Sequence, residues 1–379
     1  MLMRYKPYAT LDIEILDMTQ MRDIVQEWDD LCRRAIEDNV YFTSHYALSL
    51  LDTVATRDKV LFVTVREGDR LVGMLPVVSS LVSIPSLKAA GRAWSTDYTF
   101  SATPLLDRSC AMDAAAALVE GLRRIRAGEW IIPTVNVEAP SGRALIDALD
   151  LCGIPWNART TFERASISAD ISYEDLMNDR VGSKRRRELA RSRRRLEELG
   201  EVCHEWQTSG QGLARAVESF LNLEASGWKG ERGTALACTP ATRAFALRAF
   251  AEAGSSNRCR ADLLLLNGRP IAAGIIVLSG RTGFTVKGAY DEAYAKFSVG
   301  LLLELEVLKS FLSEGWAERL DAATAGAHVI DRLWPDRVKV ADIVLSLSSI
   351  APNARLNSYT RVMDGRATAK RWAKQLLGR

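Results

Sequence analysis

The chain has 379 residues, of which 47% are apolar and 26% are charged, a composition typical of globular proteins. One hydrophobic core rarely serves a chain of this length, so two domains or a fused pair are expected. The net charge of +3 does not by itself indicate a nucleic acid partner. Three histidines and six cysteines without a Cys-x-x-Cys pair exclude the common metal-ligand spacings, and we predict no metal and reduced thiols. The N-terminus lacks an apolar leader and no run reaches membrane-span length, which predicts a cytoplasmic protein.

The first half begins with a predicted amphipathic helix. Apolar side chains recur at helical spacing through 18–39, where Thr19 is a possible N-cap. Two β-rich runs within 60–80 flank the turn residue Gly68 and predict a hairpin. Apolar periodicity then predicts a helix, a strand and a second helix, at 111–127, 130–139 and 141–153.

A similar order of elements returns in the second half. A short β-rich stretch, 163–171, precedes two helices, which the periodicity places at 213–228 and 240–254. Asn267 and Gly268 lie between apolar runs and give a strong hairpin signal, after which a third strand ends near residue 290. The turn glycines Gly68 and Gly268 are 200 residues apart. Two hairpins can resemble each other by chance, but the repeated order of elements favours a duplicated α/β unit.

A strongly basic helix is predicted between the two halves. Residues 180–198 contain nine arginines and lysines against three glutamates, so this segment is strongly positive and the rest of the chain is slightly acidic. Leu189, Leu196 and Leu199 form a narrow apolar stripe. The helix is therefore either a solvated helix with one packed seam, or an arm that binds phosphate, nucleic acid or an acidic glycan.

The third strand of the second half leads through a short loop into an apolar helix. The helix start is predicted near Ser298 and Gly300, where free backbone N–H groups and the helix dipole favour an anion, phosphate above all. Gly300 would allow a diphosphate to approach the backbone, Ser298 could cap the helix or donate, and Lys296 could add a positive charge. The alternative is an ordinary strand-to-helix turn.

Several motifs along the chain resemble one known family. They are "WDDLCRRA", "YFTSHYALSLL" and "REGDRLVGMLPVV" in the first half, and "FLNLEASGWKG", "GRPIAAGI", "KGAYDEAYAKFSVGLLL" and "LDAATAG" in the second. Together they resemble the GNAT acyltransferase fold, and more closely the branch of cellulose-biosynthesis acetyltransferases, which is related to Fem-type peptidyltransferases. The resemblance covers residues 12–345.

The resemblance implies an α/β fold with a mixed sheet, made of two fused GNAT-like units with the basic helix between them. The implied division is an N-terminal unit, a connecting segment, a C-terminal acyltransferase unit and a tail, at 1–165, 166–205, 206–350 and 351–379.

The resemblance also implies a donor site. In the GNAT fold the corresponding strand-to-helix turn holds the pyrophosphate of coenzyme A. Binding of acetyl-CoA or another acyl-CoA is therefore expected at Lys296, Ser298, Val299, Gly300 and Leu301. The general signature starts with Gln or Arg and ends with Gly or Ala, whereas this chain has Phe297 and Leu302 at those positions. A different acyl-CoA, or an aminoacyl-tRNA as in the Fem branch, stays open as the donor.

Direct acyl transfer from a thioester requires a base for the acceptor, donors for the developing oxyanion and a proton for the thiolate. Asp291, at the end of the third strand, is the first choice for the base, and Tyr290 or Tyr294 could be the acid. Glu224 is the second choice for the base. The alternative for Asp291 is a turn-forming or capping residue.

Other side chains are predicted to bind the acceptor. Glu224 and Trp228 share one helical face, so Trp228 could form a substrate wall or pack in the core. Lys287 and Asp291 lie on one face of the strand and are predicted to pair. The predicted acceptor-binding residues are Trp228, Lys229, Lys287, Tyr294, Asp321, Arg185 and Arg186.

The expected reaction is acetyl transfer, or transfer of another acyl group, to an amine or hydroxyl. The expected acceptor is a polysaccharide, an amino sugar or a related envelope precursor. Two alternatives belong to other classes: a tRNA-dependent transferase or RNA-binding protein, and a non-catalytic scaffold derived from a GNAT enzyme.

Overall fold

The computed structural model describes residues 10–78, 90–126, 128–252, 258–324 and 329–376. The chain forms two compact units. Unit 1 comprises 1–39, 58–162 and 339–379, and unit 2 comprises 40–57 and 163–338. The segment 40–57, which includes helix α3 (Ser44–Leu51), therefore belongs to unit 2, although the sequence-based division placed it in the N-terminal unit. The ends of three predicted elements, at 79–80, 127 and 253–254, lie outside the described residues.

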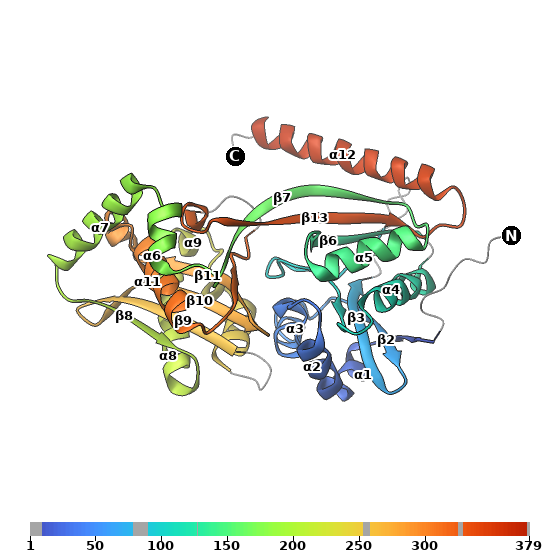
Figure 1. The fold of residues 1–379 in the computed structure, drawn as a ribbon, viewed down its shortest axis with the longest axis horizontal. Coiled ribbons are helices and arrows are strands. Elements are labelled where there is room, and N and C mark those ends of the chain that lie inside the picture. The colour runs from blue at the N-terminus through green and yellow to red at the C-terminus, as the bar shows by residue number, and fades with distance from the viewer. Residues whose placement is uncertain (1–9, 79–89, 127, 253–257, 325–328, 377–379) are drawn as a thin grey trace. The chain divides into compact units, whose positions relative to one another are not determined.

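Unit 1 is built on a mixed sheet whose strands follow the order β1-β2-β3-β4-β6-β13. These strands are β1 (Asp12–Leu16), β2 (Val60–Glu67), β3 (Arg70–Val78), β4 (Gly91–Ala93), β6 (Glu129–Asn136) and β13 (Asp336–Ser346), and a short β5 (Leu105–Leu106) pairs with β3. The helices are α1 (Met18–Asp23), α2 (Val25–Arg34), α4 (Ala111–Ile125), α5 (Pro140–Leu151) and α12 (Pro352–Leu376), shown in Figure 1. The predicted hairpin is confirmed as β2 and β3, and Gly68 turns it with a φ of 58° that suits glycine.

Unit 2 contains residues 163–168 of β7 and, in sheet order after it, β12, β11, β10, β9 and β8. These strands are β7 (Trp156–Ser168), β12 (Arg319–Asp321), β11 (Thr282–Tyr290), β10 (Arg269–Ser279), β9 (Arg258–Leu266) and β8 (Val202–Gln207). The main helices are α7 (Ser183–Glu197), α8 (Gly210–Ser226), α9 (Trp228–Glu231), α10 (Pro240–Ala246) and α11 (Val299–Glu314). Short helical turns complete the unit: η1 (Val40–Phe42), α6 (Tyr173–Asp175), η2 (Leu176–Arg180), η3 (Leu236–Cys238), η4 (Leu247–Ala251), η5 (Glu292–Phe297) and η6 (Val329–Arg332). The predicted second hairpin is confirmed as β9 and β10, which turn at Asn267 and Gly268.

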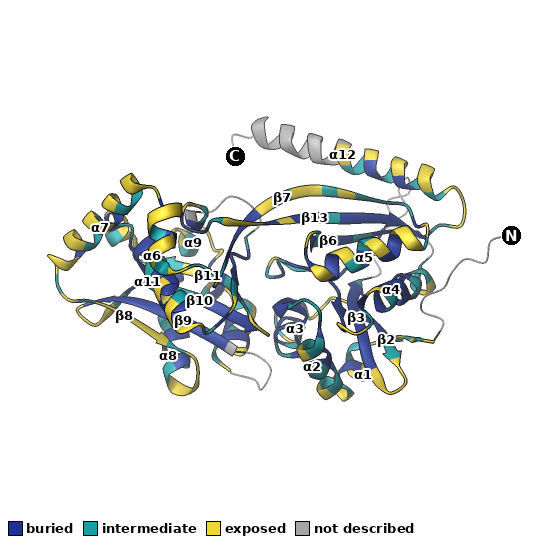
Figure 2. Ribbon diagram, viewed as in Figure 1, coloured by how far each residue is buried: buried dark blue, intermediate teal, exposed yellow. Residues whose placement is uncertain are grey.

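Strand β10 is buried on both of its faces. Ile276 and Leu278 belong to an apolar core with α11, whereas the intervening Val277 is equally buried outside that core. Because successive side chains of a strand point to opposite faces, a second layer must cover the other face, and α8 packs there. Figure 2 shows the resulting dark band along β9 and β10. The mixed α/β fold with its repeated element order is thus confirmed.

Some local predictions were wrong in detail. The N-cap of α1 is Asp17, not Thr19, because Asp17 Oδ1 accepts the backbone N–H groups of Thr19 and Gln20. In α7, Leu189 and Leu196 are buried as predicted, but Leu199 follows the helix end and is exposed. The seam of α7 is therefore made by two leucines.

Candidate functional site

The C-terminal half of β11 has one unpaired edge. Strand β10 pairs antiparallel along the whole of β11. On the other side, β12 pairs parallel with residues 282–284 only. Among the strands that the structure describes, residues 285–290 therefore pair with β10 alone, and an extended ligand could hydrogen-bond along their second edge. The register between β10 and β11 shifts at Ile275 and Ile276, and such an irregularity bends a strand locally.

Asp291 ends β11 and begins the next helical turn. Its Oδ1 accepts the N–H of Ala293 at 3.0 Å and caps η5, and its Oδ2 lies 3.2 Å from Arg269. The predicted ion pair between Lys287 and Asp291 is wrong, because Asp291 pairs with Arg269 and Lys287 lies near a different carboxylate. Asp291 thus has a capping role, and its role as a base stays a prediction.

The turn after η5 presents backbone donors at the start of α11. Ser298 has left-handed φ and ψ of 56° and 41°, and its carbonyl accepts the N–H groups of Leu301 and Leu302. Within the described part of the chain no group accepts from the N–H of Val299 or Gly300. These two donors stand at the positive end of a 16-residue helix, which is the arrangement that favours an anion.

Gly300 is exposed at this turn, and the fold itself does not require a glycine there. Its φ is not positive, and an added Cβ would only reach ordinary contact with Tyr290 Cδ1 at 3.6 Å. The open space over Gly300 is therefore consistent with a ligand, and Tyr290 lies beside it. In contrast, the side chains of Val299 and Leu301 are buried, so only their backbones could contact a ligand.

Two cations lie on the ring of Phe297 next to the turn. Lys296 Nζ is 5.0 Å and Arg195 Cζ is 5.9 Å from the ring centroid. Neither has a carboxylate partner among the described residues, and Arg195 comes from α7. Phe297, which departs from the general signature, is 4% exposed and anchors the turn in the core. Arg195 was not singled out in the sequence, because its position beside residues 296–300 is set by tertiary packing.

The buried carboxylate of Glu224 lies close to two lysines that were predicted to bind the acceptor, Lys229 and Lys287. Glu224, on α8, has a fully buried side chain. Its Oε1 lies 3.2 Å from Lys229 Nζ and 4.0 Å from Lys287 Nζ, and its Oε2 accepts the N–H of Leu236 at 2.8 Å. Lys229 also donates to the carbonyl of Gly288 on β11 at 3.0 Å.

The Glu224 cluster contains two lysines and one carboxylate. Burial lowers the pKa of Lys287, and the nearby Lys229 lowers it further, while Glu224 acts in the opposite direction. A lysine with a lowered pKa next to an unpaired strand edge is a typical feature of a functional site. Glu224 itself is occupied by two ammonium groups and one backbone N–H, so it holds the lysines in place.

Trp228 and Lys229 begin the short helix α9, which follows α8 after a sharp turn at Gly227. A Cβ on Gly230 would lie 1.8 Å from the carbonyl oxygen of Ala225, so only glycine fits there. Glu292 Oε1 accepts the N–H of Trp228 at 2.7 Å and ties this turn to η5. Trp228 is not a core residue, since 46% of its surface is exposed.

The remaining predicted residues lie apart from this edge or are engaged in structural contacts. Asp321 is buried in a two-point ion pair with Arg164 at 2.8 and 2.9 Å, and its Oδ1 also accepts the N–H of Ala323. Tyr294 is partly buried against the core. Sequence reasoning also missed Glu304, whose pKa burial raises to about 7 although Trp334 Nε1 donates to it at 2.8 Å. No local pattern distinguishes Glu304 from a surface glutamate.

The basic side chains of α7 fall into two groups. Arg185 and Arg186, the two predicted binding residues, are half-buried: Arg185 lies 3.4 Å from Glu188, and Arg186 donates to the Met177 carbonyl and Asn178 Oδ1. A second group is exposed and has no carboxylate partner in the described part of the chain; it comprises Lys184, Arg187, Arg191, Arg194 and Arg195. The spacing of the second group places it along one side of the helix, which Figure 2 shows exposed.

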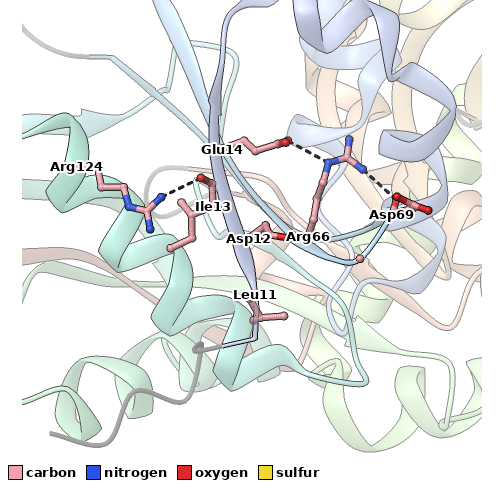
Figure 3. Close-up of a pocket in the computed structure, with 8 residues that line it drawn as sticks. Leu11, Asp12, Ile13, Glu14, Arg66, Asp69 and Arg124 are labelled. Atoms are coloured by element: carbon pink, nitrogen blue, oxygen red, sulfur yellow. Dashed lines mark hydrogen bonds and ion pairs between the residues drawn. The ribbon is translucent and has the colours of Figure 1, made fainter.

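A polar hollow also exists in unit 1, between β1 and the β2–β3 turn (Figure 3). Its central cation, Arg66, lies 3.0 Å from Glu14 and 2.5 Å from Glu27, and also donates to the carbonyl of Asp69. Arg124 donates to the carbonyl of Ile13 across the hollow. Because Arg66 is already matched by two carboxylates, this hollow offers less positive charge to an anionic donor than the turn at 296–300.

No group of three His, Cys, Asp or Glu side chains in the described ranges is arranged to hold a metal ion. No helix among these residues is both long and apolar enough to cross a bilayer.

Comparison with known proteins finds a family match in the second half of the chain. Residues 183–328 match the family model described as "Acetyltransferase (GNAT) domain". No curated protein matches the chain. The matched segment is thus a GNAT acetyltransferase domain, and it contains the Glu224 cluster, β11 and the turn at 296–300.

Similar solved structures cover nearly the whole chain. The C-terminal domain of a putative lysylphosphatidylglycerol synthetase from Agrobacterium fabrum is 12% identical over 89% of this chain and 95% of that one, with a TM-score of 0.54. FemX is 12% identical over 88% and 96%, with a TM-score of 0.56. A protein of unknown function from Bacteroides thetaiotaomicron is 10% identical over 88% and 100%, with a TM-score of 0.52. At these identities the likeness concerns the fold. The match at 183–328 supports a transferase with a GNAT acetyltransferase domain in its second half.

Proposed function

We propose that the protein transfers an acyl group from an acyl-CoA, acetyl-CoA in the first instance, to an amine or hydroxyl by direct attack. The observation that carries this proposal is the turn at 296–300. It combines two backbone N–H groups at a long helix start with the cations Lys296 and Arg195, and none of these groups has an acceptor or a carboxylate partner within the described ranges. These groups can bind the diphosphate of the donor, and Arg195 supplies the positive charge that Phe297 does not.

The unpaired edge of β11 would then hold the extended arm of the donor, with the thioester near the Glu224 cluster. Lys287 and Lys229 are positive and partly buried there, so they would stabilise negative charge on the thioester oxygen as the acceptor attacks. Tyr290, beside Gly300, would protonate the departing thiolate, and Asp291 would accept the proton of the acceptor. In this account Glu224 positions the two lysines and is not the base.

The acceptor is proposed to be a polysaccharide, an amino sugar or a related envelope precursor, as in the branch of cellulose-biosynthesis acetyltransferases. The support for this class is the resemblance of the sequence motifs and the exposed Trp228, since an indole surface can pack against a sugar ring.

The donor assignment is tested by thermal unfolding with and without millimolar coenzyme A. We expect coenzyme A to raise the melting temperature of the wild type, because a ligand that binds only the folded state stabilises it. Gly300→Glu should remove this shift, since it places a carboxylate over the two N–H groups. Gly182→Glu is the matched control, because Gly182 stands at the start of another helix, has open space around it and has a φ that other residues adopt. The donor assignment fails if the wild type shows no shift, or if both variants respond alike.

The exposed cations of α7 favour a second candidate function, transfer from an aminoacyl-tRNA. Lys184 and Arg194 are ten residues apart, which corresponds to about 15 Å of helix. The row of exposed cations ends at Arg195, which lies beside the proposed donor turn. A row of this length could contact several phosphates of an RNA backbone, and such contacts make binding strongly salt-dependent.

Binding of labelled tRNA at several salt concentrations separates the two donors. Under the second function, replacing Arg187, Arg191 and Arg194 with glutamine should weaken binding and reduce the salt slope by about 0.7–0.9 for each lost phosphate contact. A triple replacement of other exposed basic residues, Arg57, Lys59 and Arg92, is the charge-matched control. If the two triple variants bind tRNA equally, the row on α7 is a solvated surface and the acyl-CoA donor is favoured.

A further inference from the structure

Trp228 and Arg232 form an exposed stack beside the Glu224 cluster. Trp228 is 46% exposed, and the guanidinium carbon of Arg232 lies 5.1 Å from the centroid of its ring. Lys229 Nζ lies 6.0 Å from the same ring and 3.2 Å from Glu224. An indole with two cations over it thus lies next to the lysines that we assign to acyl transfer.

The turn that carries this stack is held in one conformation by its own backbone. Arg232 N–H donates to the carbonyl of Trp228, and the N–H groups of Thr234 and Ala235 both donate to the carbonyl of Lys229. Gly230 passes close to Ala225, and the N–H of Trp228 is bound by Glu292. The backbone that carries the indole and the guanidinium is therefore held in place before any ligand arrives, which reduces the entropy lost on binding.

Arg232 has no carboxylate partner among the residues that the structure describes. A guanidinium stacked on an indole keeps its N–H edge free, and that edge matches a carboxylate or a phosphate with two parallel hydrogen bonds. We propose that Trp228 and Arg232 form an acceptor subsite that selects an acceptor with a ring and an anionic group, either a carboxylate or a phosphate. The ring would pack on the part of Trp228 that the cations leave exposed, and Arg232 would bind the anion.

This subsite rests on the proposed acyl transfer and names its acceptor class. Lys229 links the subsite to the reaction, because it contacts the ring of Trp228 as well as Glu224 and the Gly288 carbonyl. An anion on Arg232 and a nucleophile at the edge of β11 would thus belong to one acceptor molecule. The small net charge of the chain does not predict such a site, since the site depends on one arginine that has no counter-ion in the part of the chain that the structure describes.

The test compares three acceptor probes with acetyl-CoA as donor: glucosamine, glucosamine 6-phosphate and galactosaminuronic acid. The full chain should show a lower KM for the two anionic sugars than for glucosamine. Arg232→Gln should raise the KM for the anionic sugars by about 10- to 100-fold and leave the KM for glucosamine and all kcat values nearly unchanged, as expected for the loss of a charge-assisted contact. Trp228→Ala should raise KM for all three sugars. Arg215→Gln, an exposed arginine on α8, should behave like the wild type.

Ligand-observed NMR with glucosamine 6-phosphate and galactosaminuronic acid measures binding without turnover. Both sugars should bind the wild type and Arg215→Gln and lose binding in Arg232→Gln. The proposal is overturned if neither sugar binds the wild type, or if Arg232→Gln binds both as tightly as the wild type. A failure of the donor is recognised separately: coenzyme A would then give no thermal shift, while the sugars would still depend on Arg232.

Discussion

Replacing Glu224 with glutamine tests whether this buried carboxylate holds Lys229 and Lys287 in place. Glutamine keeps the size of the side chain and an oxygen for the N–H of Leu236, but it removes the charge that faces the two lysines at 3.2 and 4.0 Å. Loss of one partner of a fully buried ion pair costs about 3–5 kcal/mol. The side chains of Lys229 and Lys287 are still 26% and 21% exposed, so water compensates part of this cost. We therefore expect the free energy of unfolding to fall by about 2–3 kcal/mol.

The assay is thermal or urea-induced unfolding of the full chain. For a unit of about 190 residues, a loss of this size lowers the melting temperature by roughly 5–10 °C. Glu218→Gln is the matched control, because Glu218 lies on the same helix and pairs with Arg243 at 2.7 Å, but both side chains are more than 40% exposed. That control should lose less than about 1 kcal/mol. If the two variants lose equal stability, Glu224 does not organise the lysines and the proposed oxyanion site loses its basis.

Two further predictions concern carboxylates with contrasting environments. Asp291→Asn keeps the cap on Ala293, so the fold and donor binding should be unchanged while turnover falls by about 10²- to 10⁴-fold; full turnover would leave Asp291 as a capping residue only. Glu304 has a pKa of about 7, above its ordinary value, so the folded state holds its proton more tightly and stability falls as pH rises from about 4.5 through 7. Glu304→Gln should therefore stabilise the protein at pH 8 by up to about 3 kcal/mol and not at pH 4, whereas the exposed Glu314→Gln should change neither; equal effects at both pH values would contradict the raised pKa of Glu304.

The elements that could be predicted from the sequence are those whose signals are local. Gly68 and Gly268 mark hairpins because each adopts a left-handed backbone conformation within its own turn. The start of α11 near residues 298–300 is similarly determined by a few neighbouring residues. The fold class follows from the order of such elements and needed no knowledge of contacts.

The contacts of the candidate site could not be predicted in the same way. Glu224 and Lys287 are on different elements, and the sequence paired Lys287 with the nearer Asp291 on the basis of strand alternation. Likewise, Arg195 reaches Phe297, and 40–57 joins unit 2, through packing between residues far apart in the chain. Charge composition identified α7 as a basic helix, but only the structure separates its paired arginines from its exposed ones.

Hydrogen–deuterium exchange of the turn at 296–300 tests the central claim most directly. The N–H groups of Val299 and Gly300 have no acceptor among the described residues, so they should exchange rapidly in the free protein. Saturating coenzyme A should slow exchange in a peptide covering η5 and the start of α11, and leave unchanged a peptide covering the start of α4 in unit 1. Equal exchange in the turn with and without coenzyme A, despite coenzyme A binding elsewhere on the protein, would contradict the assignment of this turn as the donor site.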